Sequence, residues 1–207
     1  LVVIAFVILA RPLGKLLLAV PPLQAYTWDV VGSLAGIAAF FVISFLSLPP
    51  IIWFVILFAL VLSITPIKRW VPAAPFVIGS LLIVFGMGRG SLWSPYYRIQ
   101  VYQAPFGYTI TVNNVGHQIV THYPNKENFY FRVYDVLNEK PFKKVLVLGA
   151  GAGSDVAIAL ANGAESVDAV EIDPIIYKLG VELNPDHPYE DPRVTVHVDD
   201  GRSFLRN

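Results

Sequence analysis

The protein has 207 residues, of which 55% are hydrophobic, and its formal net charge is zero. It contains no cysteine, which excludes disulfide bonds, cysteine-ligated zinc and a thiol nucleophile. Its basic residues do not cluster among aromatic ones, and we therefore expect no nucleic-acid partner.

The charges divide the chain into unlike parts. Five of the fifteen basic residues but only one of the fifteen acids, Asp29, precede Trp93. We predict three regions, residues 1–92, 93–142 and 143–207. Both ends fall inside predicted elements, so we expect the sequence to be a fragment of a longer protein.

Residues 1–92 contain long apolar runs that indicate a transmembrane α-helical bundle. Val30–Leu48 is nineteen residues without a charge, close to the ~20 needed to cross a bilayer. Ile51–Thr65 follows after two prolines, and Ala73–Gly88 is a third run, although both are short for a full span. Residues 1–10 are interpreted as the end of an earlier span. The pattern predicts an integral membrane protein.

Asp29 is interpreted as the N-cap of the first complete span, so no ionisable group lies inside a predicted span. Because such groups mark transport paths, anchoring is favoured over transport. Gly32 and Gly36 either allow a second helix to approach closely or merely reflect the glycine content of membrane helices. By the positive-inside rule, the basic residues before the first complete span and after the second place both of these chain segments on the cytoplasmic side. A full crossing by Ala73–Gly88 would then put the residues that follow it outside.

Residues 93–142 alternate as half-buried strands do. Arg98–Tyr102 and Tyr108–Val112 are joined by a predicted turn at residues 104–107, and Asn113-Asn114 turns into a third strand at residues 118–121. These strands predict a small antiparallel β-sheet. A helix is expected from Asn125 to about residue 138, stopped by Lys140-Pro141, with four apolar residues on one face: Phe129, Val133, Val136 and Leu137.

Residues 143–207 show a strand, a glycine-rich turn, a helix and a second strand. Lys144–Leu148 precedes Gly149-Ala150-Gly151-Ala152-Gly153, Ser154–Asn162 is helical, and Val167–Ile172 is the next strand, followed by a third at residues 194–198. This βαβ order predicts parallel strands in a Rossmann-like α/β domain. Glu171, at the end of the second strand, can accept both hydroxyls of a ribose, and Asp200 can accept from the amine of adenine.

The motif has other interpretations. Tight glycine turns also occur in α/β sheets that bind nothing. No Gly-Lys-Ser/Thr follows, which excludes a P-loop, and Ser154 stands where NAD-binding loops have a third glycine. A nucleoside without phosphates fits better, and this points to S-adenosylmethionine or a related compound.

Several motifs together resemble the spermidine synthases, the polyamine aminopropyltransferases, and most of all their membrane-fused bacterial, methyltransferase-like relatives. From about Trp93 onward these motifs are Ser94-Pro95-Tyr96-Tyr97-Arg98-Ile99, the Asn114-to-Gln118 turn, the VLVLGAGAG run, Val170-Glu171-Ile172-Asp173, Asp191-Pro192-Arg193-Val194 and Asp199-Asp200-Gly201-Arg202. The resemblance implies a small β-sheet before a Rossmann-like domain, and transfer of an aminopropyl group from decarboxylated S-adenosylmethionine to putrescine.

The resemblance also implies roles for individual residues. The implied cofactor-binding residues are Gly149, Gly151, Gly153, Glu171, Asp200, Gly201 and Gln118. Ala152 stands where the family has an acid, and Asp155 either favours the helix dipole or contacts the cofactor's amino end in its place. Tyr97 replaces a glutamine, and residues 128–132 lack the Tyr-His-Glu of the polyamine pocket. The family's catalytic aspartate would follow a fourth strand, so no catalytic residue is assigned and we expect these 207 residues alone to be inactive.

Three functions stay open at this point. The first is a membrane-anchored aminopropyltransferase that uses S-adenosylmethionine or its decarboxylated form and a putrescine-like amine. The second is a methyltransferase that acts on a small or lipid-soluble substrate, and the third is a non-catalytic nucleoside-binding membrane protein. The four histidines lack metal-ligand spacing, so no metal is expected. We expect the bacterial inner membrane, a cytoplasmic soluble part and, if a homodimer forms, a seam along Arg98–Thr121.

Overall fold

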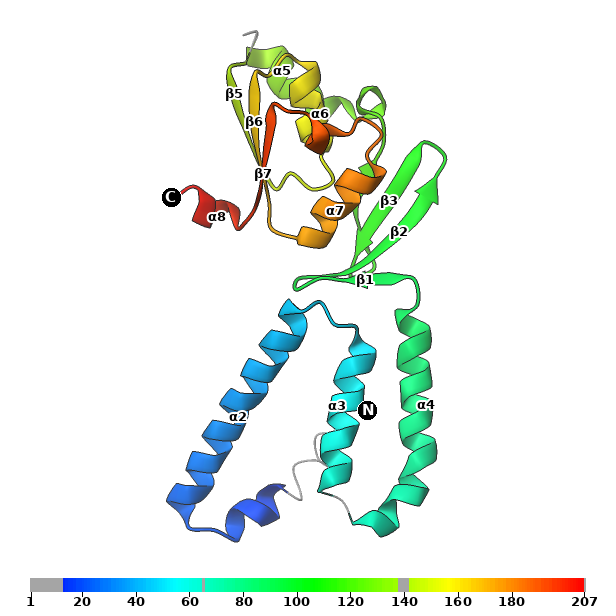
Figure 1. Cartoon of the computed structure of the whole chain (residues 1–207), viewed down its shortest axis with the longest axis vertical. Coiled ribbons are helices and arrows are strands. Elements are labelled where there is room, and N and C mark those ends of the chain that lie inside the picture. Colours follow the sequence, from blue (N-terminus) through cyan, green and yellow to red (C-terminus); the bar gives the residue numbers. More distant parts are fainter. Residues whose placement is uncertain (1–12, 65, 138–141, 207) are drawn as a thin grey trace. The chain divides into compact units, whose positions relative to one another are not determined.

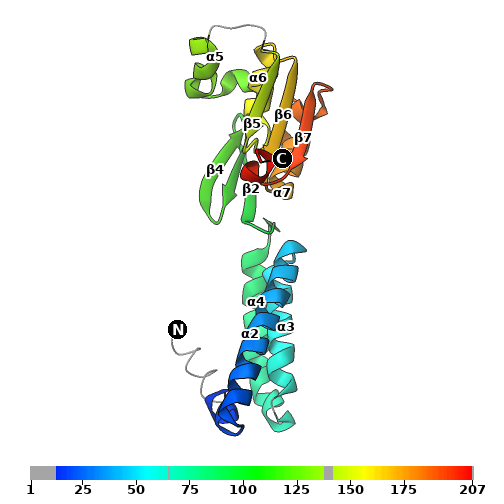
Figure 2. The ribbon, with the colours of Figure 1, turned by 90° about the vertical axis from the view of Figure 1, so that its left-hand side faces the viewer.

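The computed structural model describes residues 13–64, 66–137 and 142–206. The chain divides after Phe45 into two units, and each is described by itself. The predicted stub at residues 1–10, and the predicted helix stop at Lys140-Pro141, lie outside the described residues. Figures 1 and 2 show the elements from two directions.

The first unit contains helix α2, Pro22–Phe45. The helix starts eight residues before the predicted span because a proline suits the first helical position. Asp29 therefore lies inside the helix, and its interpretation as an N-cap was wrong. The helix ends before Ser47, whose φ of 55° is incompatible with a right-handed helix, and before the two prolines that follow.

The second unit begins with an antiparallel helical hairpin, α3 (Pro50–Ser63) and α4 (Trp70–Gly88), joined through the short 3₁₀ helix η1 (Ile67–Arg69). These helices pack against each other along their length (Figure 1). Helix α3 begins at Pro50, one residue before the predicted run Ile51–Thr65, and Pro49 is its N-cap. The third run extends further toward its N-terminus than expected and forms a helix of 19 residues.

Two helical segments are long and apolar enough to cross a bilayer, Pro22–Phe45 and Ile67–Gly88. No residue of either one is buried within the described chain. Large side chains such as Phe41, Val71 and Phe76 are more than two-thirds exposed. Apolar surface of this extent requires a lipid or protein neighbour in place of water.

A four-stranded antiparallel sheet follows in the order β1-β2-β3-β4, with strands Ser91–Trp93, Arg98–Ala104, Gly107–Val112 and Val115–Val120. Ala104 pairs with Gly107, and Asn113 and Asn114 take positive φ, so both predicted turns are two-residue hairpin turns. The sequence did not predict β1, because three residues are too few to show alternation. It pairs with β2 directly after the end of α4.

The segment between the sheets differs from the predicted long helix. It forms two 3₁₀ turns, η2 (Tyr123–Asn125) and η3 (Asn128–Phe131), and the short helix α5 (Arg132–Leu137). Lys126 interrupts it with an extended backbone, because its ammonium group is buried and donates to the carbonyl of Ile119. The four apolar residues expected on one face of the helix are all more than half exposed.

The last region is a three-stranded parallel sheet in the order β5-β6-β7, with strands Lys144–Leu148, Ser166–Glu171 and Val194–Val198. Helices α6 (Ser154–Ala161) and α7 (Pro174–Leu183) cross over on the same face (Figures 1 and 2), and α8 (Gly201–Phe204) follows β7. A short 3₁₀ helix, η4 (Pro188–Glu190), precedes β7. This confirms the predicted Rossmann-like βαβ unit behind an antiparallel sheet.

Two clusters of buried side chains hold these sheets. In one, Val156 and Ala159 of α6 pack on Val167 and Ala169 of β6. In the other, α7 packs against the antiparallel sheet, with Ile176 and Leu179 of the helix next to a buried side chain from each of three strands: Ile99, Ile110 and Val120. Helix α7 therefore joins the two sheets.

Asp173 connects the parallel sheet to the segment before β2. Its carboxylate is fully buried, accepts from the backbone N–H of Ile175 and Ile176, and accepts from the hydroxyl of Ser94 at 2.5 Å. The predicted helix cap at Asp173-Pro174 is thus confirmed.

We expect Asp173→Ala to lower the free energy of unfolding by about 2 to 4 kcal/mol, because it removes an N-cap and the buried, charge-assisted bond from the hydroxyl of Ser94. Chemical denaturation of the detergent-solubilised protein, followed by tryptophan fluorescence, would measure this. Asp168→Ala, on the same sheet at a half-exposed side chain, is the control and should change stability far less. Equal losses would show that the cap does not hold α7.

Candidate functional site

The glycine turn after β5 approaches its neighbours so closely that side chains are excluded. Gly149, Gly151 and Gly153 all have positive φ. A Cβ atom on Gly151 would lie 2.6 Å from Oε1 of Gln118, and one on Gly153 would lie 2.6 Å from Cγ of Pro188. Position 153 needs glycine for space as well as for backbone conformation, whereas at position 151 the contact is with the movable end of Gln118 and the positive φ is the main constraint.

Glu171 fixes the turn to the end of β6. One carboxylate oxygen accepts from the backbone N–H of Gly151 at 2.7 Å, and the other accepts from the N–H of Asp173 at 2.8 Å. The side chain is only 6% exposed. A buried carboxylate needs such partners, and each oxygen keeps further acceptor capacity for a ligand hydroxyl.

A cavity of about 330 Å³ lies beside this bridge. This volume is within the range of small-molecule pockets, about 300 to 1,000 Å³. Five residues predicted to bind the cofactor line it, from the antiparallel sheet, the glycine turn, α6 and β6: Gln118, Gly149, Gly151, Asp155 and Glu171. The fold thus brings together residues that are up to 53 positions apart in the sequence.

A β-bulge directs two adjacent side chains of β4 into this cavity. Ile110 pairs with Gln118 but the next residue of β3 pairs with Gly116, so His117 is the unpaired extra residue. Bulges turn side chains out of strand alternation. Both His117 and Gln118 consequently line the cavity.

Gln118 also fixes the glycine turn from the opposite side. Its Oε1 accepts from the N–H of Ala152 at 3.1 Å. Its Nε2, like Oγ of Ser154, is buried and has no hydrogen-bond partner within the described part of the chain. Since an unsatisfied buried polar group costs about 1 to 3 kcal/mol, both atoms favour a polar ligand in the cavity.

Asp155 lies in the first turn of α6 at the cavity wall. Burial raises the pKa of its carboxyl above the ordinary value, although the ammonium group of Lys126 opposes this rise. Burial likewise lowers the pKa of Lys126, against the effect of Glu127 and Asp155. Nearby Tyr130 has a raised pKa because of burial and the charge of Asp155. A ligand cation beside Asp155 would therefore stabilise its ionised form.

Three of the predicted site residues do not line the cavity. Gly153 packs under Pro188 and Tyr189, and Gly201 lies against Leu148. Asp200 is exposed, and its carboxylate caps α8 by accepting from the N–H groups of residues 202 and 203, at 3.0 Å each. The preceding residue, Asp199, donates its N–H to the carbonyl of Glu171. Asp200 therefore lies at the same edge of the sheet as Glu171. Its predicted contact with adenine stays a prediction.

Four polar side chains of the cavity were not predicted as site residues: Tyr97, His117, Tyr130 and Ser154. Position 97 was noted only because the resemblance implies glutamine there. The alternation of polar and apolar residues does not reveal the bulge at His117, although a glycine just after a hairpin turn, Gly116, is one indication of it. Tyr130 was placed in a long helix that does not form, so its approach to the glycine turn was not visible.

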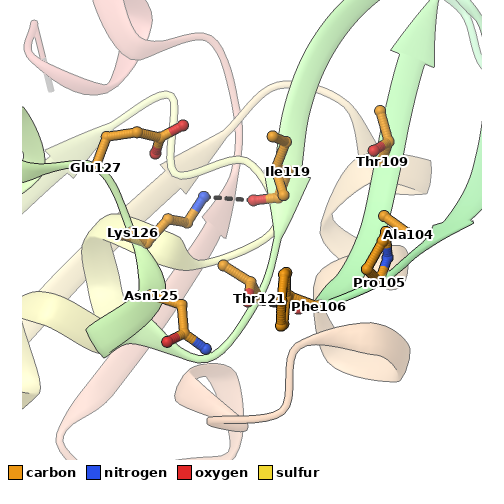
Figure 3. A pocket seen from close by; sticks show the side chains of 9 residues that line it. All are labelled: Ala104, Pro105, Phe106, Thr109, Ile119, Thr121, Asn125, Lys126 and Glu127. Atoms are coloured by element: carbon orange, nitrogen blue, oxygen red, sulfur yellow. Dashed lines mark hydrogen bonds between the residues drawn. The ribbon is translucent and has the colours of Figure 1, made fainter.

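A larger cavity, of about 480 Å³, lies between the β2-β3 turn and the segment around Lys126. Figure 3 shows the side chain of Lys126 reaching toward the carbonyl of Ile119, with the side chains of Thr121 and Phe106 below this bond in the view. No residue predicted for the cofactor lines this cavity. The smaller cavity, with the convergent polar groups, is therefore the candidate site.

The described residues contain no cluster of three or more His, Asp or Glu side chains that could hold a metal. Three histidines form pairs with acids instead: His122 with Asp186, His187 with Glu190, and His197 with Asp168.

Comparison with known proteins gives a consistent result. Spermidine synthase 1 of Hyoscyamus niger is 41% identical over 68 residues, which are 31% of this chain and 22% of that protein. The polyamine aminopropyltransferase of Alkaliphilus oremlandii is 32% identical over 123 residues, 55% of this chain and 41% of that protein. Over the matched residues, the chain is similar to spermidine synthases and to a polyamine aminopropyltransferase.

Solved spermidine synthases match as well. One, in complex with the transition-state analogue AdoDATO, is 18% identical over 56% of this chain and 42% of that protein, with a TM-score of 0.47. The Thermotoga maritima spermidine synthase is 19% identical, over 56% of this chain and 42% of that protein, with a TM-score of 0.45. No protein-family model matches the chain. The chain spans between about a fifth and two fifths of the length of the two curated spermidine synthase relatives described here.

The raised pKa of Asp155 predicts a dependence of stability on pH. The native carboxyl keeps its proton at pH values where the unfolded chain has lost it, so stability falls as pH rises from about 4 through the raised pKa. Asp155→Asn removes this loss. We expect the variant to melt at a higher temperature than the native protein at pH 7, and the difference to shrink toward pH 4. Glu165→Gln, at an exposed acid, is the control. A difference that does not vary with pH would contradict the assignment.

Proposed function

We propose that the protein is a membrane-attached transferase of the spermidine synthase type, which binds an adenosyl sulfonium beside the glycine turn and transfers its aminopropyl group to an amine. The observation that carries this proposal is the cavity in which Glu171, the glycine turn and Gln118 meet. The sequence similarity to spermidine synthases and to a polyamine aminopropyltransferase supports the choice of reaction.

The cavity supplies what a nucleoside needs. The carboxylate of Glu171 can accept the ribose hydroxyls, since its backbone partners already fix its orientation. The unpaired amide of Gln118 and the hydroxyl of Ser154 can bond to further polar groups of the ligand. Tyr97 and Ile176 add apolar surface for a planar base.

The chemistry is a displacement at carbon. The amine nitrogen attacks the carbon next to the sulfonium, the carbon–sulfur bond breaks, and a neutral thioether leaves while the amine loses a proton. Holding both reactants in line is the main contribution of such a site. Asp155 lies where a carboxylate would stabilise the cationic amino end of the donor or of the acceptor, and its environment favours a cationic partner.

A second candidate is methyl transfer from intact S-adenosylmethionine. Ala152 favours it, because this position in the glycine turn carries no acid that would repel the carboxylate of the intact cofactor. The two buried donors, Nε2 of Gln118 and Oγ of Ser154, could bond to that carboxylate.

Calorimetric titration of the intact native protein with both sulfonium compounds would test the site. We expect micromolar binding of the decarboxylated form and at least about tenfold weaker binding by Glu171→Gln, whose amide would face a backbone N–H. Asp168→Asn, on the same strand but outside the cavity, should bind as the native protein does. Asp200→Asn would show whether that residue reaches the ligand.

Clear preference for the carboxylated compound would replace aminopropyl transfer by methyl transfer. Failure to bind either compound would reject both enzymatic proposals and favour a protein without this cofactor.

We further propose that α2, α3 and α4 lie in a bilayer and that the Rossmann-like domain faces the cytoplasm, where its cofactor is available. The unburied apolar surface of the helices supports the first part. The basic pair Lys68-Arg69, at the far end of the α3-α4 hairpin, favours the opposite orientation by the positive-inside rule. We give the need for a cytoplasmic cofactor more weight than these few charges.

The absence of native cysteines makes this orientation measurable. We expect Phe106→Cys, on the antiparallel sheet, to react with a membrane-impermeant maleimide only after the cells are opened, and Ser63→Cys, at the end of α3, to react in intact cells. Labelling of Phe106→Cys in intact cells would reverse the orientation. Release of the protein by alkaline carbonate would reject membrane insertion.

A further inference from the structure

The ends of α3 and α4 that adjoin the antiparallel sheet enclose two small adjacent cavities, of about 140 and 190 Å³. Both are lined by Pro50, Val84 and Gly88, and together they form what we call the hairpin groove. Its remaining wall residues are Pro49, Ile51, Phe54, Phe85, Met87, Arg89, Trp93 and Arg98. The groove is apolar along the helices and cationic at its end.

Each of the two cavities has one arginine in its wall, Arg89 in the smaller and Arg98 in the larger. Arg98 is held in place by a bond from Nη2 to the carbonyl of Met87 at 2.7 Å and from Nε to Oγ of Ser91 at 2.9 Å. These bonds use two of its five donors, so three remain for a ligand. Arg89 lies over the ring of Phe85 and is exposed.

Helix α3 begins at the groove with no side-chain cap and no acid in its first turn, but the antiparallel helix α4 ends there, so the negative end of its dipole offsets the positive end of α3. A free donor adds to the arginines. The indole N–H of Trp93 is buried and has no hydrogen-bond partner among the described residues. Trp93 packs edge-on against Trp53, which fixes its ring.

No acid of the α3-α4 hairpin or of the antiparallel sheet balances these charges. The sequence has no Asp or Glu from Val30 to Lys126, a stretch that includes the whole α3-α4 hairpin and the antiparallel sheet. Arginine is the residue best suited to bidentate binding of phosphate. The groove therefore favours an anion that carries apolar chains.

We propose that the hairpin groove binds the phosphate of an anionic phospholipid, with its acyl chains along α3 and α4. The proposal relies on the membrane insertion proposed above but not on the adenosyl cofactor. Arg89 and Arg98 hold the phosphate oxygens, the indole of Trp93 donates to one of them, and Phe54 and Val84 contact the beginning of the chains.

Thermal unfolding of the protein in detergent, with added phosphatidylglycerol, phosphatidylcholine or inorganic phosphate, tests this. We expect phosphatidylglycerol alone to raise the melting temperature. Arg89→Gln should weaken its apparent affinity about tenfold, as expected for loss of one charge-assisted bond. Trp93→Phe, which keeps an aromatic ring and removes the N–H donor, should weaken it as well. Arg69→Gln, at the other end of α4 and outside the groove, is the matched control and should bind normally.

Equal weakening by Arg69→Gln and Arg89→Gln would overturn the proposal, because it would show only a general attraction between opposite charges. Equal stabilisation by inorganic phosphate would overturn the assignment to a lipid. The measurement is independent of cofactor binding and of labelling in cells, so its failure is distinguishable from failure of the proposed function.

Discussion

The bridge made by the Glu171 carboxylate is the interaction on which the site depends. It joins the glycine turn after β5 to the start of α7 after β6, through two backbone N–H groups. Asp173, whose N–H it accepts, in turn receives the hydroxyl of Ser94 from the segment before β2. One buried acid thus fixes the edge of the parallel sheet, and its neighbour ties that edge to the antiparallel sheet. The cavity lies where these connections meet.

The sequence predicted the regular part of this arrangement well. The alternation of β2 and β3, the Asn113-Asn114 turn and the Asp173-Pro174 cap are local signals, and each is present in the structure. The glycine turn and Glu171 were predicted because a βαβ unit places both at one sheet edge. Gln118 rested on the family resemblance alone, and the structure places it across the turn.

What the sequence did not show depends on contacts between distant segments. The bulge at His117 arises from the pairing of β3 with β4, and nothing in the local pattern specifies it. The helix expected after Asn125 fails because the ammonium group of Lys126 is drawn inside to the carbonyl of Ile119, a tertiary effect that overrides propensity. Asp29 was wrongly predicted to cap the helix because the sequence does not distinguish a proline at the first position of a helix from a proline in a loop.

The arms of the helical hairpin differ in length, 14 residues in α3 and 19 in α4. At 1.5 Å per residue they measure about 21 Å and about 28 Å, while the hydrocarbon layer is about 30 Å thick. In a bilayer α4 would nearly match this layer, whereas α3 would fall short by about 9 Å. Lipids around α3 would have to compress to cover its ends. Hydrophobic mismatch would therefore draw the protein toward thin regions of a membrane.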